Sequence, residues 1–413
     1  MKFELLKNKN FVLLLLGQVV SGVGSKMQSF ALALYVLNIT GSASKFATIL
    51  SLSFVPELII GPISGVIVDW VNRKKLVVLL DVLSGLLALI FAFMYLINNT
   101  LGIFKLSILV VLLSIISTIF QPAITTILPS IVDKEKLPEA NSLWTVTSSA
   151  ANILAPIIAG VLLQYLGLFF ILVINSISFL LSGLSEVFIQ VPRNNNLPEK
   201  ITVKSFWIDF TEGIKFIANQ KLILSICILL MTINFFLSPI ITIGQPYILI
   251  NIFNATDIQY GLFQSGLIMP MFIAPLLFTL ASRKYQLKTL IIKSLGISSL
   301  IILILSFISN SLFLKLTKVN LIPIIILFII FFVIMLFDLI ANLAIYTLEQ
   351  DFIPLNILGR VESAMMSLSF ALAPLGQIIF GLLFDKFPIG ICIAAGGLLN
   401  ITSIFICKKL MDK

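Results

Sequence analysis

Long apolar runs separated by short polar segments make up almost the whole chain. Each run is close to or above the roughly 20 residues that an α-helix needs to cross the hydrocarbon core of a bilayer. A closed β-barrel would instead show weaker, alternating segments of about ten residues, so these continuous runs predict membrane-spanning helices. There are about twelve runs, at residues 11–37, 44–68, 76–97, 103–128, 141–165, 168–189, 222–250, 258–281, 289–310, 321–348, 361–384 and 389–407.

The composition agrees with an integral membrane protein. Apolar residues make up 59% of the 413 residues and charged residues make up 11%, and the mean hydropathy is +1.14. A soluble domain does not have this composition. The first run is longer than the apolar region of a signal peptide and shows no convincing cleavage site, so we expect it to be retained as the first helix.

Basic residues are distributed unevenly between the loops on the two sides of the predicted membrane. If the N-terminus lies in the cytoplasm, 21 of the 27 basic residues fall on the cytoplasmic side and five fall on the other side. This asymmetry predicts a protein of the cell (plasma) membrane with both termini in the cytoplasm. The excess of basic residues, which gives the net charge of +9, then serves to orient the protein in the membrane. Because no soluble module carries a basic face, we expect no nucleic-acid partner.

The organisation along the chain is two-fold. We predict an N-terminal six-helix bundle over residues 1–190, a cytoplasmic linker over 191–221 and a C-terminal six-helix bundle over 222–413. Weak internal matches support a parallel duplication, which is typical of transporters whose two bundles rock about a central site. The linker contains an amphipathic stretch at 207–217, for which a membrane-surface helix and a solvated connector both stay open.

A group of five residues follows the second run at the first predicted cytoplasmic turn. The group consists of Gly65, Asp69, Arg73, Lys74 and Lys75. Orientation alone would explain the basic residues. It would not explain Gly65. Glycine has no side chain, so it leaves a smooth helix face next to Asp69, whose carboxylate is able to form a hydrogen bond with the end of a neighbouring helix or with an arginine.

This group resembles the signature of the major facilitator superfamily between its second and third helices, with Asn72 where the family usually has glycine. The resemblance implies an all-α integral membrane protein of twelve transmembrane helices in two six-helix bundles. It also implies that the group is a gating motif that latches the cytoplasmic side. In the second half, Thr279 and Arg283 occupy the places of Gly65 and Asp69, so we expect the N-terminal half to carry the latch.

Three further segments resemble the macrolide-efflux-like drug exporters of that superfamily. They are GQVVSGVG at 17–24, FQPAITTILPSIVDKEKLPEANSL at 120–143 and LGRVES at 358–363. This resemblance implies efflux of drug-like compounds by an antiporter. One departure is that the fourth run lacks the arginine that many proton-coupled relatives carry there and contains only Lys105, at its outer edge.

Two segments place small residues around a proline inside a predicted helix. They are ANILAPIIAG, with Pro156 and Gly160, and FALAPLGQIIFG, with Pro374. Proline bends a helix and small residues allow close packing, so these positions are candidate bends for gating. Ordinary helix packing is an equally open interpretation. The first segment resembles the antiporter motif of the family, with Ala155 where glycine is commoner.

Of the ionisable residues within the apolar runs, we expect four to matter most: Lys26, Glu57, Asp81 and Asp338. Each costs about 2.5–3.5 kcal/mol at a helix centre. Lys26 and Glu57 reach similar depths, so they are able to pair, either as a structural bridge or as a switch in which Glu57 takes up a proton. Asp338 has no basic residue in its own run. We expect Glu57, Asp338 and Lys26 to be the proton-coupling candidates, and Asp81 to cap a helix or contact the basic loop.

The sequence excludes several kinds of chemistry. It contains no histidine, and its three cysteines lie singly inside apolar runs, so we expect no metal site and no redox pair. No P-loop is present in any polar segment. We therefore expect no enzyme activity and no cofactor. The energy for transport would come from an ion gradient such as protons, from a partner, or from the gradient of the substrate.

Polar and aromatic residues near the middle of the runs are candidates for lining a substrate cavity. They are Gln18, Gln28, Asn234, Phe235, Gln245, Asn342 and Tyr346. A mostly apolar cavity favours an amphipathic or lipophilic small molecule. We predict a secondary transporter that exports such drug-like compounds by proton antiport and alternating access. An exporter of a lipid or siderophore-like metabolite, and a non-transporting membrane receptor or scaffold, stay open as alternatives.

Overall fold

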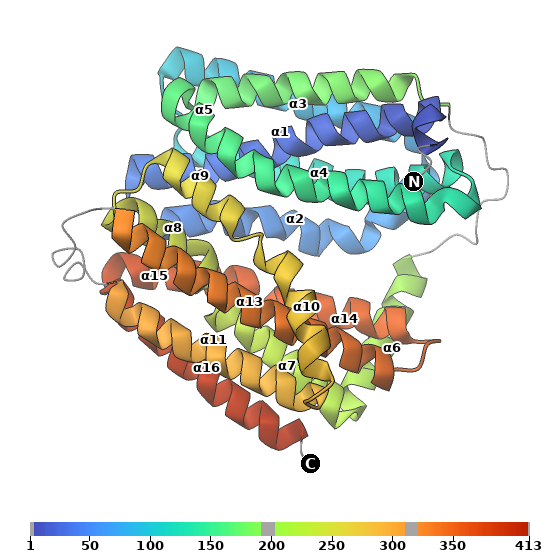
Figure 1. Ribbon diagram of the computed structural model, residues 1–413. Helices are drawn as coiled ribbons and strands as arrows, with labels where there is room; N and C mark the ends of the chain where they lie inside the picture. The colour runs from blue at the N-terminus through green and yellow to red at the C-terminus, as the bar shows by residue number, and fades with distance from the viewer. Residues whose placement is uncertain (1–3, 191–202, 310–320, 412–413) are drawn as a thin grey trace. The chain divides into compact units, whose positions relative to one another are not determined.

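Each predicted apolar run forms helix in the computed structural model, which describes residues 4–190, 203–309 and 321–411 (Figure 1). The first half contains η1 (Glu4–Lys7), α1 (Lys9–Thr40), α2 (Ala43–Trp70), α3 (Arg73–Asn98), α4 (Ile103–Ile131), η2 (Lys134–Lys136) and α5 (Leu137–Val187). The second half contains α6 (Val203–Asn219), α7 (Lys221–Phe236), η3 (Ile240–Gly244), α8 (Gln245–Tyr247), η4 (Ile248–Ile252), α9 (Asp257–Gly266), α10 (Pro270–Ser282), α11 (Leu287–Ile308), α13 (Leu321–Phe352), α14 (Leu358–Ala371), α15 (Ala373–Lys386) and α16 (Ile389–Met411). Over these ranges no strand is present, and the all-α prediction is confirmed.

Gly167 divides α5 into two membrane crossings. A continuous helix of 51 residues would be about 76 Å long, more than twice the roughly 30 Å thickness of the hydrocarbon core. Gly167 has φ 77° and ψ 180°, a conformation that is essentially restricted to glycine. Eleven described helical segments are long and apolar enough to cross a membrane, and Lys134–Val187 is one of them. Because this segment supplies two crossings, the predicted total of twelve is confirmed.

Several helices of the second half are interrupted beside a proline. Pro239 precedes the π-helical segment η3, Pro270 begins α10, and α14 ends at Ala371 just before Pro374 in α15. Proline has no backbone N–H and its ring clashes with the preceding turn, which explains interruptions at these positions. By contrast, Pro156 lies inside α5 with no non-helical residue beside it, and Gly160 is buried in the same helix.

The described chain separates into two compact units. Unit 1 contains Met1–Tyr35 and Leu52–Phe206, and unit 2 contains Val36–Ser51 and Trp207–Lys413. In unit 1, Phe11, Val77 and Ile124 belong to a buried apolar core. In unit 2, Ile291 and Val361 belong to a second core. The turn between α1 and α2 clusters with unit 2, although it comes from the first half of the sequence. The predicted bundle boundaries, 1–190 and 222–413, stay a prediction.

The amphipathic stretch predicted in the linker is part of α6, and it packs on unit 2. Ile217 belongs to the buried core of that unit, and Phe210 and Ile214 pack against the core. Trp207 and Ile208 are exposed. One apolar side of α6 is therefore covered by unit 2. The remainder of the predicted linker, at 191–202, lies outside the described residues.

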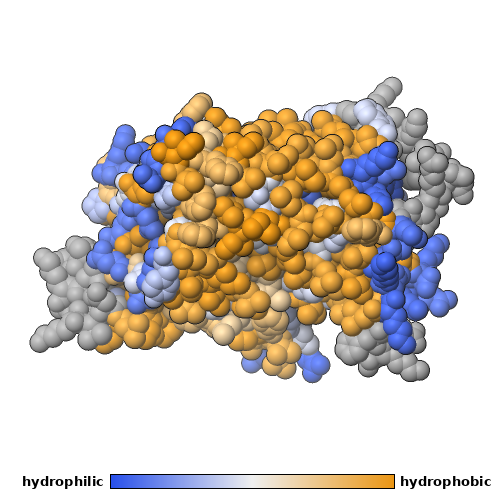
Figure 2. Space-filling view, turned by 90° about the horizontal axis from the view of Figure 1, so that it is seen from above, coloured by the Kyte–Doolittle hydropathy of each residue, from blue (hydrophilic) through white to orange (hydrophobic). Residues whose placement is uncertain are grey.

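Large apolar side chains cover much of the surface. Figure 2 shows a face on which hydrophobic residues form a broad band and hydrophilic residues gather toward two ends. Ile97, Phe104 and Phe307 are each 78–80% exposed. Monomeric soluble proteins rarely expose contiguous apolar patches this large, whereas lipid tails solvate them without cost. The surface therefore agrees with helices that face lipid.

Candidate functional site

The predicted gating motif extends from α2 into α3. Gly65 lies inside α2, Arg73, Lys74 and Lys75 form the first turn of α3, and the side chain of Asp69 is outside the described part of the chain. α2 ends at Trp70, and α3 begins at Arg73. Asn72 is the N-cap of α3, where its side-chain oxygen accepts a hydrogen bond from the backbone N–H of Lys75 at 3.1 Å. An asparagine at this position satisfies one of the free N–H groups of the helix start, which gives a physical reason for the departure from the family's glycine. The latching role of the group stays a prediction.

Lys26 is bound to an amide instead of to Glu57. Its amine donates a hydrogen bond to Asn152 Oδ1 at 2.6 Å, which joins α1 to α5. Glu57 is exposed on α2. Among the described residues no ion pair joins Lys26 to Glu57, so the pairing that their similar depth allows is not found. Equal depth does not fix the direction in which a side chain leaves its helix, and this explains the difference.

Asp338 carries a buried carboxyl oxygen with no hydrogen-bond partner in the described part of the chain. This oxygen is Oδ1, and Ser298 of the neighbouring helix α11 lies beside the carboxyl group. The hydroxyl of Ser298 also has no partner there. One residue further along α11, Ser299 accepts a hydrogen bond from Asn400 of α16 at 2.8 Å. Polar groups from three helices thus lie close together inside unit 2.

The two glutamines predicted for a cavity in unit 1 lie on α1. Gln28 is 2% exposed, and its oxygen accepts a hydrogen bond from Asn175 of α5 at 2.6 Å. This contact needs Gly24, because a Cβ at that position would overlap the side-chain oxygen of Asn175. Gln28 therefore joins α1 to α5 inside unit 1. Gln18 is half-buried, and its Oε1 has no partner within the described residues.

The other five cavity candidates belong to unit 2. Gln245 is 1% exposed, and its amide nitrogen lacks a partner over the described ranges. Asn234 and Phe235 are half-buried on α7, where Asn234 donates to its own helix. Asn342 and Tyr346 are exposed one turn apart on α13, so they share one face. A substrate role for these residues stays a prediction.

The turn between α1 and α2 is bound by a single carboxylate, that of Asp385 at the end of α15. This carboxylate accepts the backbone N–H groups of Ala43 at 2.7 Å and Ser44 at 3.0 Å. It also accepts the hydroxyl groups of Ser42 at 2.6 Å and Ser44 at 2.5 Å. Asn251 donates to Gly41 O of the same turn at 2.8 Å. These bonds lie within unit 2 and form a polar clasp.

The set of four intramembrane ionisable residues predicted from the sequence is incomplete. Glu186, near the end of α5, is 2% exposed, and Glu349 of α13 is 6% exposed. Glu186 lies inside the run at 168–189, so its position in the membrane follows from the hydropathy pattern. That pattern does not show that its side chain is buried. Glu349 and Asp385 each follow the end of a predicted run by one residue. The helices continue past those ends, which explains why both acids were missed.

Comparison with known proteins places the chain among transport proteins. The family model described as Major Facilitator Superfamily matches residues 14–376. Macrolide efflux protein A of Streptococcus pyogenes is 24% identical over 96% of this chain and 94% of its own length. An uncharacterised MFS-type transporter of Bacillus subtilis, YkuC, is 25% identical over 54% of this chain and 53% of its own length.

Solved transporter structures share the fold. A bacterial homologue of the iron transporter ferroportin, in an inward-facing state, matches with a TM-score of 0.73 at 19% identity, over 99% of this chain and 98% of the other. The nucleoside transporter NupG matches with a TM-score of 0.72 at 12% identity, over 96% of this chain and 99% of the other. These likenesses extend over nearly the full length of each chain and confirm the predicted fold class.

Proposed function

Because the chain belongs to the Major Facilitator Superfamily, whose model matches residues 14–376, we propose that it is a secondary transporter that exports amphipathic or lipophilic compounds in exchange for protons. Similarity to Macrolide efflux protein A over 96% of the chain supports export and this class of substrate. The membrane is the cell membrane, and both termini are cytoplasmic, as the basic residues of the loops favour.

The observation that carries the proton coupling is the buried carboxyl group of Asp338, which lies beside Ser298 and forms no ion pair among the described residues. Its Oδ1 is buried in a membrane helix and has no partner among the described residues. An ionised carboxylate in such a place is costly unless a counter-charge or hydrogen bonds compensate it. Binding a proton removes this cost, and releasing the proton restores it. Protonation of Asp338 therefore changes the free energy of the conformation that buries this side chain. An antiporter requires such a link between proton binding and conformation.

Uptake into inside-out vesicles that contain the purified protein tests the proposal. A fluorescent lipophilic cation and a macrolide are supplied separately, with and without an acidic lumen. Asp338→Asn removes the acid and keeps the shape of the side chain. Asp351→Asn is the matched control, because Asp351 lies on the same helix and is exposed. We expect gradient-driven accumulation in the wild type and in the control, and its loss in Asp338→Asn.

Three outcomes would contradict parts of this proposal. Accumulation that does not depend on the gradient would exclude proton exchange. Gradient-driven accumulation that persists in Asp338→Asn would exclude this residue as the carrier. If neither compound accumulates in the wild type, the drug-like substrate class is wrong, and an exporter of a lipid or siderophore-like metabolite or a non-transporting receptor takes its place.

A further inference from the structure

A pair of buried acids lies in unit 1, between α3 and α5. Asp81 of α3 and Glu186 of α5 are each 2% exposed. The Cβ atom of Asp81 is 3.4 Å from the position that a Cβ on Gly183 would take. Glu186 follows Gly183 by three residues on α5, so it leaves the helix on the same side. The close packing of α3 on α5 thus brings the two carboxyl groups to one place.

The polar atoms at this place are poorly satisfied. Asp81 Oδ2, Glu186 Oε2 and the hydroxyl oxygen of Ser182 are buried without a well-formed hydrogen bond in the described chain, although Ser182 lies beside both carboxyl groups. Ser182 is itself 1% exposed and lies next to Gly183. Three oxygens that lack a well-formed hydrogen bond in one buried location are expensive. If both acids were ionised, their charges would also repel each other. The site as built therefore calls for a positively charged ligand.

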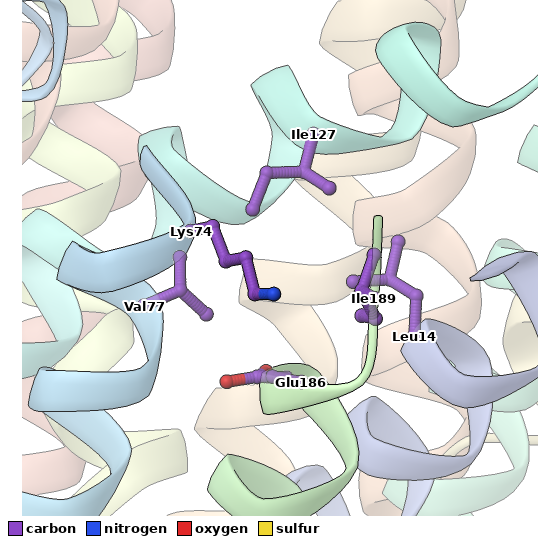
Figure 3. A pocket seen from close by; sticks show the side chains of 6 residues that line it. All are labelled: Leu14, Lys74, Val77, Ile127, Glu186 and Ile189. Carbon is purple, nitrogen blue, oxygen red and sulfur yellow. The ribbon is translucent and has the colours of Figure 1, made fainter. Parts of the chain in front are cut away.

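Lys74 lies beside one member of this pair, Glu186. Glu186 lines a small pocket together with Lys74, Leu14, Val77, Ile127 and Ile189. Figure 3 shows the Lys74 side chain extending from α3 into this pocket, beside the Glu186 carboxyl group. Lys74 precedes Asp81 by seven residues, about two helical turns, and so shares its side of α3. Over the described residues no ion pair joins Lys74 to either acid.

Lys74 and Glu186 are the charged residues among those that line the pocket in the described chain. α3 contributes Asp81 and Lys74, α5 contributes Glu186 and Ser182, and α1 and α4 contribute the apolar residues Leu14 and Ile127. In this apolar environment Lys74 is the basic residue that lines the pocket together with Glu186. It also belongs to the basic turn that the family resemblance associates with gating.

We propose that Asp81, Glu186 and Ser182 form a second proton-binding site, and that Lys74 is the counter-ion that replaces the proton. In the loaded state one carboxyl group carries a proton, which the other carboxylate and Ser182 bind. On release, the O–H bond breaks, the proton passes to water at the α2–α3 turn, and the Lys74 ammonium group moves onto the carboxylate. The inference rests on the proposed function, because it places proton exchange next to the predicted gate.

Infrared spectroscopy of the purified full-length protein in lipid nanodiscs tests the site without any substrate. A protonated carboxyl group has a C=O stretching band that is separate from the carboxylate bands. We expect the difference spectrum between wild type and Glu186→Gln, at acidic pH, to contain such a band, which disappears as the pH rises. Glu135→Gln, at an exposed position, is the control and should give no such band. Asp81→Asn is a second variant in case Glu186→Gln does not fold.

The role of Lys74 has its own readout. In Lys74→Met the band should persist to a higher pH, because the carboxylate has lost its counter-ion, whereas a purely structural lysine would leave the titration of the band unchanged. If the Glu186→Gln and Glu135→Gln difference spectra are alike, the site does not hold a proton. If sodium or manganese chloride removes the band at constant pH and choline chloride does not, the ligand is a metal cation and the proposal is wrong. Loss of drug transport with the band intact would contradict only the proposed function.

Discussion

The carboxylate of Asp385 caps the N-terminus of α2 by accepting the backbone N–H of Ala43 at 2.7 Å. Residues 43 and 385 lie in different halves of the sequence. The first N–H groups of a helix have no partner within the helix, and the partial positive charge of the helix start favours an acid. The cap therefore uses a general property of helices to hold the α1–α2 turn against α15.

Removing this cap should loosen the α1–α2 turn. We expect Asp385→Ala to weaken the local structure by about 1–2 kcal/mol, the usual cost of losing a helix cap, because four hydrogen bonds lose their acceptor. Hydrogen exchange of the amide groups at Ala43 and Ser44 should then be roughly tenfold faster. Lys386→Ala, at the adjacent exposed position, is the control. Equal exchange in the two variants would show that Asp385 does not hold the turn.

A second prediction concerns Arg360, which binds α6 to α14. Its guanidinium group contacts Asp209 at 3.0 Å and Glu212 at 2.6 Å. The three side chains are 42–49% exposed, so the gain in stability is small, about 1 kcal/mol or less. We expect Arg360→Ala to increase proteolysis within α6 a few-fold, while Lys215→Ala, an exposed residue on the same helix, leaves it unchanged. Unchanged cleavage in Arg360→Ala would mean that apolar packing alone holds α6.

The break in α5 gives a third prediction. Gly167→Ala should destabilise the protein by about 1–3 kcal/mol, because alanine does not adopt φ 77° and ψ 180° without strain. Thermal unfolding measures this as a lower melting temperature. Gly296→Ala is the control, since no atom lies within 4 Å of its added Cβ and alanine favours a helix interior. If both variants melt alike, the break at Gly167 does not depend on glycine.

The proposed orientation gives a fourth prediction. All three native cysteines are buried, so an added surface cysteine should dominate labelling by a membrane-impermeant maleimide. In intact cells we expect labelling of Lys45→Cys, in the first turn of α2, and protection of Lys75→Cys, in the first turn of α3. Both positions are exposed in the folded chain. The reverse pattern would place the termini outside the cytoplasm.

The sequence predicts the helices well because hydropathy alone determines which segments can cross a bilayer. The run at 389–407, for example, lies within α16, and the gap between the fifth and sixth runs coincides with the break at Gly167. The boundaries are less accurate. The predicted run at 321–348 stops four residues before α13 ends, and Glu349 was therefore missed.

The contacts between polar side chains could not be predicted from the same pattern. Rise per residue gives the depth of a side chain, but not its direction around the helix axis. Lys26 and Glu57 were matched by depth, whereas Lys26 binds Asn152. Asp81 and Glu186 come together only because α3 packs against α5, and this packing belongs to the tertiary structure, which the hydropathy pattern does not determine.

The lumenal pH of inside-out vesicles tests the central claim, substrate exchange for protons, most directly. The vesicles contain a trapped pH indicator and an acidic lumen, and a macrolide is added outside. We predict that the lumen becomes more alkaline when the compound enters, and that Asp338→Asn abolishes this change while Asp351→Asn does not. Accumulation of labelled compound at constant lumenal pH would contradict the claim.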